Sequence, residues 1–252
     1  MKVNYKLIGI AGILSICLII FFGGCNVVGS KNAATSKPIL WINGTYAVLT
    51  KINNQDVNIF GGVKPNIFNK QVALNLLKES WEVTTKDELD DQIYFLTKGE
   101  MNKSFLEEVD YYEISSYGES EFDEAIKEVQ DSNDVSYFQN MFDAYNKFGD
   151  KAILGWDLSR ATQLCASGYI ADFYTYEEAT DKALVIGKQI QNTFNSWDDF
   201  FDSYLYGYVF WSEDDINDPN SKYAERVKIL DELRKDPNSP LKLDWNLDLD
   251  TK

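Results

Sequence analysis

Apolar residues from position 38 onward recur mainly at the spacing of amphipathic helices. Thr175 to Glu178 has the T-x-x-E pattern of a capping box, and five apolar residues follow at intervals of 4, 3, 4 and 4: Ala179, Ala183, Ile186, Ile190 and Phe194. Such intervals keep side chains on one face of a helix with 3.6 residues per turn. A second box, Thr85 to Glu88, precedes another helical run, which Gly99 is predicted to end: Leu89, Ile93 and Leu96.

Three further helices are predicted from weaker patterns. Asn69 is the predicted N-cap of a helix that reaches about Trp81 and carries four apolar residues along one side: Ala73, Leu76, Leu77 and Trp81. The other two helices are defined by two sets of apolar residues: Phe122, Ile126 and Val129, and then Phe138, Met141, Phe142 and Tyr145 before Gly149.

A helix after Ser196 is predicted to lie at the centre of the core, because it is apolar on nearly every side. Its aromatic face is formed by Trp197, Phe200, Phe201, Tyr204, Tyr208 and Trp211, with Tyr206 and Phe210 on other sides. Ser196 is the expected N-cap, and Gly207 permits a close approach of a neighbouring backbone. Aromatic surfaces also bind sugars and peptides, but the helical spacing already accounts for these residues and favours core packing.

Two segments allow more than one secondary structure. Residues Ile39 to Ile52 contain Asn43-Gly44, a hairpin signal, although their apolar spacing also fits a helix. Residues Leu241 to Asp250 alternate strictly between apolar and polar, as a strand with one solvated face does. No second long strand is evident, so we expect an extended tail lying over helices.

The pattern as a whole predicts a mainly α fold with one compact multi-helix domain and a short extended C-terminal segment. The chain has 252 residues, only five prolines and no internal repeat, and the predicted domain covers residues 38–249. A domain of this size buries roughly 70% of the surface of its unfolded chain.

The N-terminus has the layout of a secretory signal. Lys2 and Lys6 precede an uncharged apolar run, and Phe22-Gly23-Gly24-Cys25 resembles a bacterial lipobox. We therefore predict a signal peptide over residues 1–24, lipidation of Cys25 and a flexible tether over residues 25–37. The alternative is an uncleaved membrane anchor, because the uncharged stretch is about the 20 residues needed to cross a bilayer. Both interpretations place the domain outside the cytoplasm on a cell membrane.

Composition excludes several classes of site. The chain has 24 basic and 40 acidic residues. Removal of residues 1–24 takes away Lys2 and Lys6, so 22 basic residues remain and the formal net charge is −18. This charge repels nucleic acid and anionic lipid head groups. The absence of histidine excludes imidazole bases and histidine-containing metal sites. Cys17 leaves with the signal and Cys25 is lipidated, so Cys165 remains, in an apolar helical stripe that indicates a structural role. No cofactor is predicted.

Several motifs support a family resemblance. Residues Gly155 to Trp211 contain W-D-x-x-R, Y-T-Y-E-E-A and S-W-x-x-F in this order, and the segment resembles the bacterial family known as domain of unknown function 1266. The resemblance implies a mainly helical fold, and thus favours a helix over Ile42 to Ile52, but it implies no activity or cofactor. Similar proteins often carry histidine after the glycine that corresponds to Gly99, where this chain has Glu100.

Asp157 and Arg160 form the sharpest candidate pair, because three helical residues place them on neighbouring faces at the border of the apolar stripe. The functional interpretation is a half-buried arginine that Asp157 orients toward a carboxylate or phosphate in a cleft. The structural interpretation, an ion pair that ties this helix to its neighbour, is favoured.

These features predict a membrane-anchored lipoprotein whose domain binds an unknown protein or small ligand without catalysis. One alternative is an enzyme that acts on cell-envelope material through carboxylates, with Asp157, Arg160 and Glu177 in one cleft. The other is cation-dependent binding by the acidic loop Ser212 to Glu225. Counted from Asp214, this loop lacks the glycine and the position-three ligand of a helix-loop-helix calcium site, which leaves at best a weak cation site.

Overall fold

The computed structural model describes residues 35–250, and within this range the chain forms eleven α-helices and no β-strand. In chain order the elements are α1 (Lys37–Thr45), α2 (Ala47–Ile52), α3 (Ile67–Trp81), α4 (Lys86–Thr97), α5 (Glu100–Tyr111), η1 (Ile114–Ser116), α6 (Glu119–Ile126), α7 (Ser132–Phe148), η2 (Gly149–Lys151), α8 (Leu154–Ile170), α9 (Tyr176–Thr193), α10 (Trp197–Ser212), α11 (Lys222–Lys235) and η3 (Pro240–Lys242). The predicted mainly α domain is confirmed. The predicted signal peptide, Cys25 and most of the tether lie outside the described residues.

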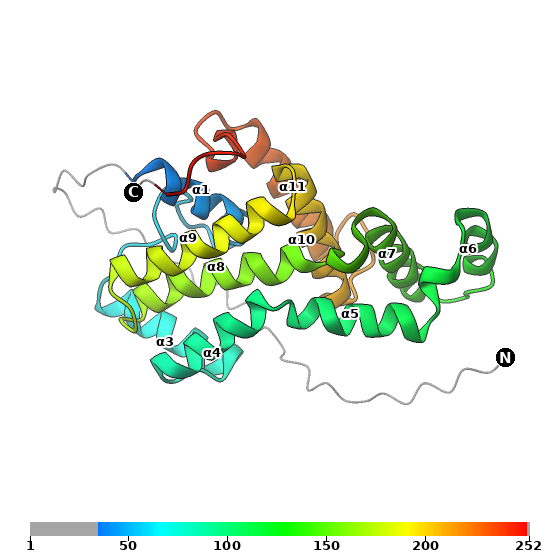
Figure 1. Ribbon diagram of the computed structural model, residues 1–252, viewed down its shortest axis with the longest axis horizontal. Helices are drawn as coiled ribbons and strands as arrows, with labels where there is room; N and C mark the ends of the chain where they lie inside the picture. The colour runs from blue at the N-terminus through cyan, green and yellow to red at the C-terminus, as the bar shows by residue number, and fades with distance from the viewer. Residues whose placement is uncertain (1–34, 251–252) are drawn as a thin grey trace.

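Helix α8 occupies the centre of the domain, and the other long helices surround it (Figure 1). It packs against α9 and α10 and also against α3, α4 and α5. Close packing is possible because α8 carries small residues where its neighbours approach: a Cβ atom on Gly155 would lie 2.7 Å from the Phe200 carbonyl oxygen. Most of α8, including the polar residues Asp157, Ser159 and Thr162, is therefore buried.

The aromatic helix α10 is buried as its composition predicts. Ser196 caps it by accepting the Asp199 backbone N–H at 3.1 Å. Phe200 and Phe201 are among the largest fully buried side chains. Gly207 allows the predicted close approach, because a Cβ atom there would lie only 2.3 Å from the Cβ atom of Trp156 on α8. The aromatic face of α10 is therefore packed in the core.

The segment from Ile39 to Ile52 is helical, as the family resemblance implies. It forms α1 and α2 with a break at Tyr46, whose backbone has φ −123° and ψ 17°. A buried polar contact joins this segment to α8, since the hydroxyls of Thr45 and Thr162 lie 2.7 Å apart and the Ser159 hydroxyl donates to the Thr45 carbonyl at 2.8 Å. The Asn43-Gly44 pair is buried within the helix rather than in a hairpin turn.

The predicted capping boxes of α4 and α9 are confirmed, but three details of other helices were wrong. The N-cap of α3 is Asn66, whose side chain accepts the backbone N–H of Asn69 at 2.8 Å. Leu76 is 40% exposed, because α3 contacts the core along a narrower face than its composition suggests. Helix α6 ends at Ile126, before Val129. For the N-cap of α3, asparagine is favoured at both position 66 and position 69, so the local pattern alone did not distinguish Asn66 from Asn69.

Helices α5, α6 and α7 enclose a second cluster of buried apolar side chains, to the right of α8 in Figure 1. Phe122 and Phe142 stack with ring centroids 3.9 Å apart, and Phe105 contacts Phe210 of α10 at 5.3 Å. Phe210 lies on a different side of α10 from the main aromatic face. The all-round apolar character of α10 thus reflects its position between two clusters.

The C-terminal segment confirms the predicted alternation and, as expected, is not paired with a strand. Residues from Leu243 to Asp250 have no regular secondary structure, and their odd-numbered side chains are buried or half-buried while the even-numbered ones are exposed. The Gln191 side chain of α9 donates to the carbonyls of Trp245 and Leu247, at 2.6 and 3.0 Å. A side chain from a helix thus provides hydrogen bonds that a neighbouring strand would otherwise supply.

Candidate functional site

The Asp157 side chain, on α8, caps the N-terminus of a different helix, α5. Helix α5 begins after Gly99, which has no side chain to accept the first backbone N–H groups. The Asp157 Oδ2 atom accepts the backbone N–H of Asn102 at 3.0 Å, and the N–H of Met101 also stabilises the carboxylate. Asp157 is fully buried, not half-buried as its position on the helix suggested. The carboxylate therefore occupies the place of a capping side chain, although it lies 55 residues away in sequence.

Asn102 secures the same junction through its side chain. Its Oδ1 atom accepts the backbone N–H of Ile153 at 2.9 Å, and its Nδ2 atom donates to the Asp150 carbonyl at 2.8 Å. Residues at the start of α5 and α8 are thereby fixed to one another. The sequence did not single out Asn102. Its only signal was a helix that starts after a glycine and therefore needs caps from elsewhere in the chain.

Burial raises the pKa of Asp157 from 3.8 to about 7, and this effect exceeds the opposing influence of the Asn102 N–H and the Arg160 charge. The Oδ1 atom is buried and has no hydrogen-bond partner among the described residues. The second carboxylate oxygen is therefore uncompensated. Burial thus extends the pH range over which Asp157 is protonated well above that of an exposed carboxyl.

Arg160 does not form the predicted ion pair with Asp157, since no nitrogen–oxygen distance of 4.0 Å or less joins them. Its guanidinium carbon instead lies 4.3 Å from the centroid of the Trp81 ring and 5.3 Å from that of Trp156. Arg160 is half-buried. The arginine therefore links α3 and α8 through aromatic contacts, with Asp157 as a nearby charge only.

Glu177 is separate from this pair. It is exposed in the first turn of α9, just beyond the turn that joins α8 to α9 (Figure 1). Asp157 lies 13 residues before the end of α8, which corresponds to about 20 Å along the helix axis. Asp157, Arg160 and Glu177 therefore do not line one cleft.

The acidic loop between α10 and α11 uses the Asp214 carboxylate internally. Asp214 Oδ2 accepts the Tyr208 hydroxyl at 3.0 Å and the backbone N–H of Tyr223 at 2.8 Å. Within residues 35–250, no group of three or more acidic or cysteine side chains is placed to hold a metal ion. The loop is thus fastened to α10 and α11 by hydrogen bonds.

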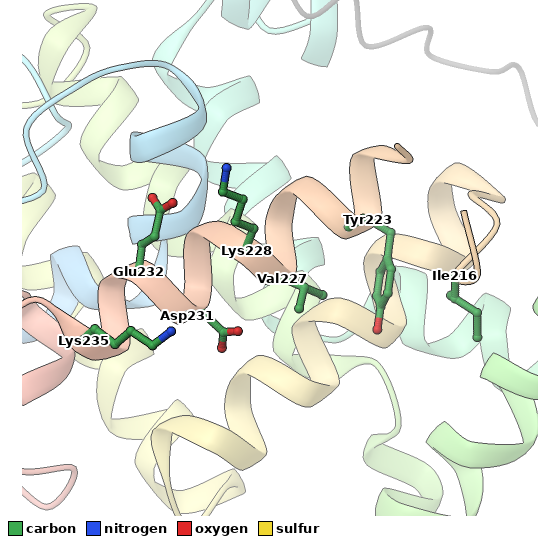
Figure 2. Close-up of a pocket in the computed structure, with 8 residues that line it drawn as sticks. Ile216, Tyr223, Val227, Lys228, Asp231, Glu232 and Lys235 are labelled. Carbon is green, nitrogen blue, oxygen red and sulfur yellow. The ribbon is translucent and has the colours of Figure 1, made fainter. Parts of the chain in front are cut away.

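A shallow groove of about 520 Å³ runs along the exposed side of α11. Ile216, Tyr223 and Val227 form its apolar part, and charged side chains surround the rest: Lys228, Asp231, Glu232 and Lys235. Figure 2 shows Lys228 and Glu232 on one side of α11, and Asp231 and Lys235 on the other. Sequence analysis missed this groove, because Ile216 reaches it from a loop with no periodic pattern.

Cys165 is fully buried, as its place in the apolar stripe of α8 predicts. Burial raises the pKa of its thiol to about 12. A thiol in this environment is protonated at neutral pH and reacts poorly.

Comparison with known proteins gives one result. The model of the family described as Protein of unknown function (DUF1266) matches residues 76–245. The chain belongs to the DUF1266 family. The match includes Trp81, Asn102, Asp157, Arg160 and the groove along α11. No curated protein and no solved structure matches the chain significantly. Across residues 35–250, none of the helices combines the length and the hydropathy that spanning a bilayer requires.

Proposed function

We propose that this DUF1266 protein is a lipoprotein of the cell membrane, facing outside the cytoplasm, whose helical domain binds a protein or a small ligand without catalysis. The observation that carries the membrane anchor is the N-terminal sequence: two lysines, an apolar run, and two glycines directly before Cys25. A diacylglyceryl group on Cys25 then tethers the domain, whose first helix begins at Lys37.

Two arrangements support binding rather than catalysis. The carboxylate of Asp157 is used as a helix cap, and Glu177 follows the far end of α8, which is about 20 Å from Asp157 along the helix axis. The groove on α11 combines an apolar part, formed by Tyr223 and Val227, with charged side chains of both signs. An apolar surface with polar groups around it is typical of a site that recognises a partner.

The anchor is tested by metabolic labelling of the full chain with an alkyne fatty acid in a bacterial host. We expect the wild type to incorporate label and to sediment with membranes, and Cys25→Ser to lose the label. Cys17→Ser is the matched control, because it also removes a cysteine from the N-terminal region but leaves the lipobox intact. Equal labelling of Cys25→Ser and the wild type would refute lipidation at Cys25.

The binding surface is tested by a photo-crosslinking amino acid at position 227, in the groove. We expect a reproducible crosslinked species from intact cells, with a defined mass shift. Position 111 is the control, since Tyr111 on α5 is 72% exposed but lies outside the groove. Crosslinking at both positions to the same extent, or at neither, would contradict a specific partner in the groove.

A further inference from the structure

Arg160 is exceptional among the three arginines of this acidic chain. Arg234 pairs with Asp198 at 2.6 Å and with Asp231 at 3.3 Å. Arg226 donates to the Lys222 carbonyl at 3.3 Å. Within residues 35–250, Arg160 makes neither a hydrogen bond nor an ion pair. A side chain with five N–H donors thus has no acceptor in the described protein.

The Arg160 guanidinium is nevertheless held in place. It lies between the rings of Trp81 and Trp156, at 4.3 and 5.3 Å from their centroids. The two tryptophans come from different helices, α3 and α8, so the arrangement depends on the folded domain. Aromatic contacts on its faces leave the edge of a guanidinium, which carries the N–H groups, available for hydrogen bonding.

The donors of Arg160 also reach the molecular surface. No Arg160 nitrogen is among the buried side-chain atoms that lack a partner, although none of these nitrogens has a partner among the described residues. Arg160 is half-buried, so part of its side chain contacts solvent. Within residues 35–250, no acceptor occupies the N–H groups of Arg160 that a ligand would have to displace.

Two carboxylates act on the charge of Arg160, and burial weakens one of them by favouring its protonated form. Asp157 and Glu100 are the carboxylates near Arg160, and the first of these has a pKa of about 7, so it offsets less than one full charge at neutral pH.

We propose that Arg160, held between Trp81 and Trp156, binds an oxyanion through its N–H edge. The ligand group is a carboxylate or a phosphate, because both present two oxygens at the spacing of the guanidinium fork. The inference names a ligand class for the proposed binding domain and depends neither on the lipid anchor nor on the α11 groove. Arg160 is a binding residue, and Asp157 adjusts the charge beside it.

The proposal is tested by titrating the full chain, in mild detergent, with inorganic phosphate and separately with acetate at constant ionic strength. Quenching or enhancement of tryptophan fluorescence reports binding, because two tryptophans flank Arg160. We expect saturable binding of at least one of the two ions. Arg160→Lys keeps the charge but loses the fork, so we expect at least a tenfold weaker Kd. Arg234→Lys is the matched control and retains the wild-type Kd, since Arg234 already has carboxylate partners.

A second measurement needs no variant. Phenylglyoxal modifies accessible arginines, and mass spectrometry measures the modification of each arginine separately. We expect the bound ion to protect Arg160 in the wild-type chain several-fold while Arg234 is modified at an unchanged rate. Selective protection supports the site even if Arg160→Lys fails to fold. Absence of saturable binding of both ions, an unchanged Kd in folded Arg160→Lys, or equal protection of Arg160 and Arg234 would overturn the proposal.

Discussion

Replacing Asp157 with asparagine tests how burial of this carboxylate affects stability. Asparagine has nearly the same shape, and its side-chain oxygen can still accept the backbone N–H of Asn102, so the cap of α5 is retained. Its amide nitrogen takes the place of the unpaired Oδ1 atom, as the hydroxyl of a protonated carboxyl does. Asp157→Asn therefore resembles the neutral form of the wild type at every pH.

The size of the expected difference in the free energy of unfolding between Asp157→Asn and the wild type follows from the pKa of Asp157. Burial raises the pKa of Asp157 from 3.8 to about 7 in the folded state, so the folded protein binds a proton more tightly than the unfolded chain. The neutral Asp157 carboxyl contributes fully to the free energy of unfolding below about pH 4, and this contribution is lost as the pH rises to about 7. A shift of about 3 pH units corresponds to at most about 4 kcal/mol, at 1.36 kcal/mol per unit.

The assay is urea unfolding of the wild type and Asp157→Asn, followed by circular dichroism at several pH values from 4 to 8. Contributions of the other titrating groups cancel in the difference between the two proteins. We expect the free energy of unfolding of Asp157→Asn, relative to the wild type, to rise by up to about 4 kcal/mol between pH 4 and pH 8. A difference that stays constant over this range would refute the argument that burial dominates at Asp157.

Three further predictions concern packing, capping and reactivity. Gly207→Ala brings a Cβ atom to 2.3 Å from Trp156 and should lower the free energy of unfolding by about 1–3 kcal/mol in urea titrations, whereas Gly118→Ala, with 3.6 Å of space, should change it little. Thr175→Ala removes the N-cap of α9, and we expect it to lower the free energy of unfolding, measured in the same titrations, by about 1 kcal/mol. Thr175→Ser keeps a capping hydroxyl and should retain most of this stability. Cys165 should resist iodoacetamide in the folded protein and react after unfolding, as measured by mass spectrometry; rapid labelling of the native state would contradict its burial.

Local sequence predicted those elements whose causes lie within a few residues. The capping box of α9 and its apolar stripe require only the period of the helix, and Thr175 and Glu178 form the expected reciprocal hydrogen bonds. Alternation in the C-terminal segment predicted correctly which side chains face inward. The lack of a second long strand in the sequence predicted an unpaired tail, but not its partner: Gln191 of α9 binds the backbone where a neighbouring strand would.

The sequence by itself determined a mainly helical domain and the positions of most helices, and it predicts an export signal ahead of the domain. Tertiary structure decided what the chemically interesting residues do. Asp157 caps a helix that begins 57 residues earlier in the chain, and Arg160 lies against Trp81 of α3. These contacts join distant parts of the chain, and their energies depend on burial and on neighbouring charges. Neither quantity is a property of the local residue pattern, which is why spacing alone suggested an ion pair between Asp157 and Arg160.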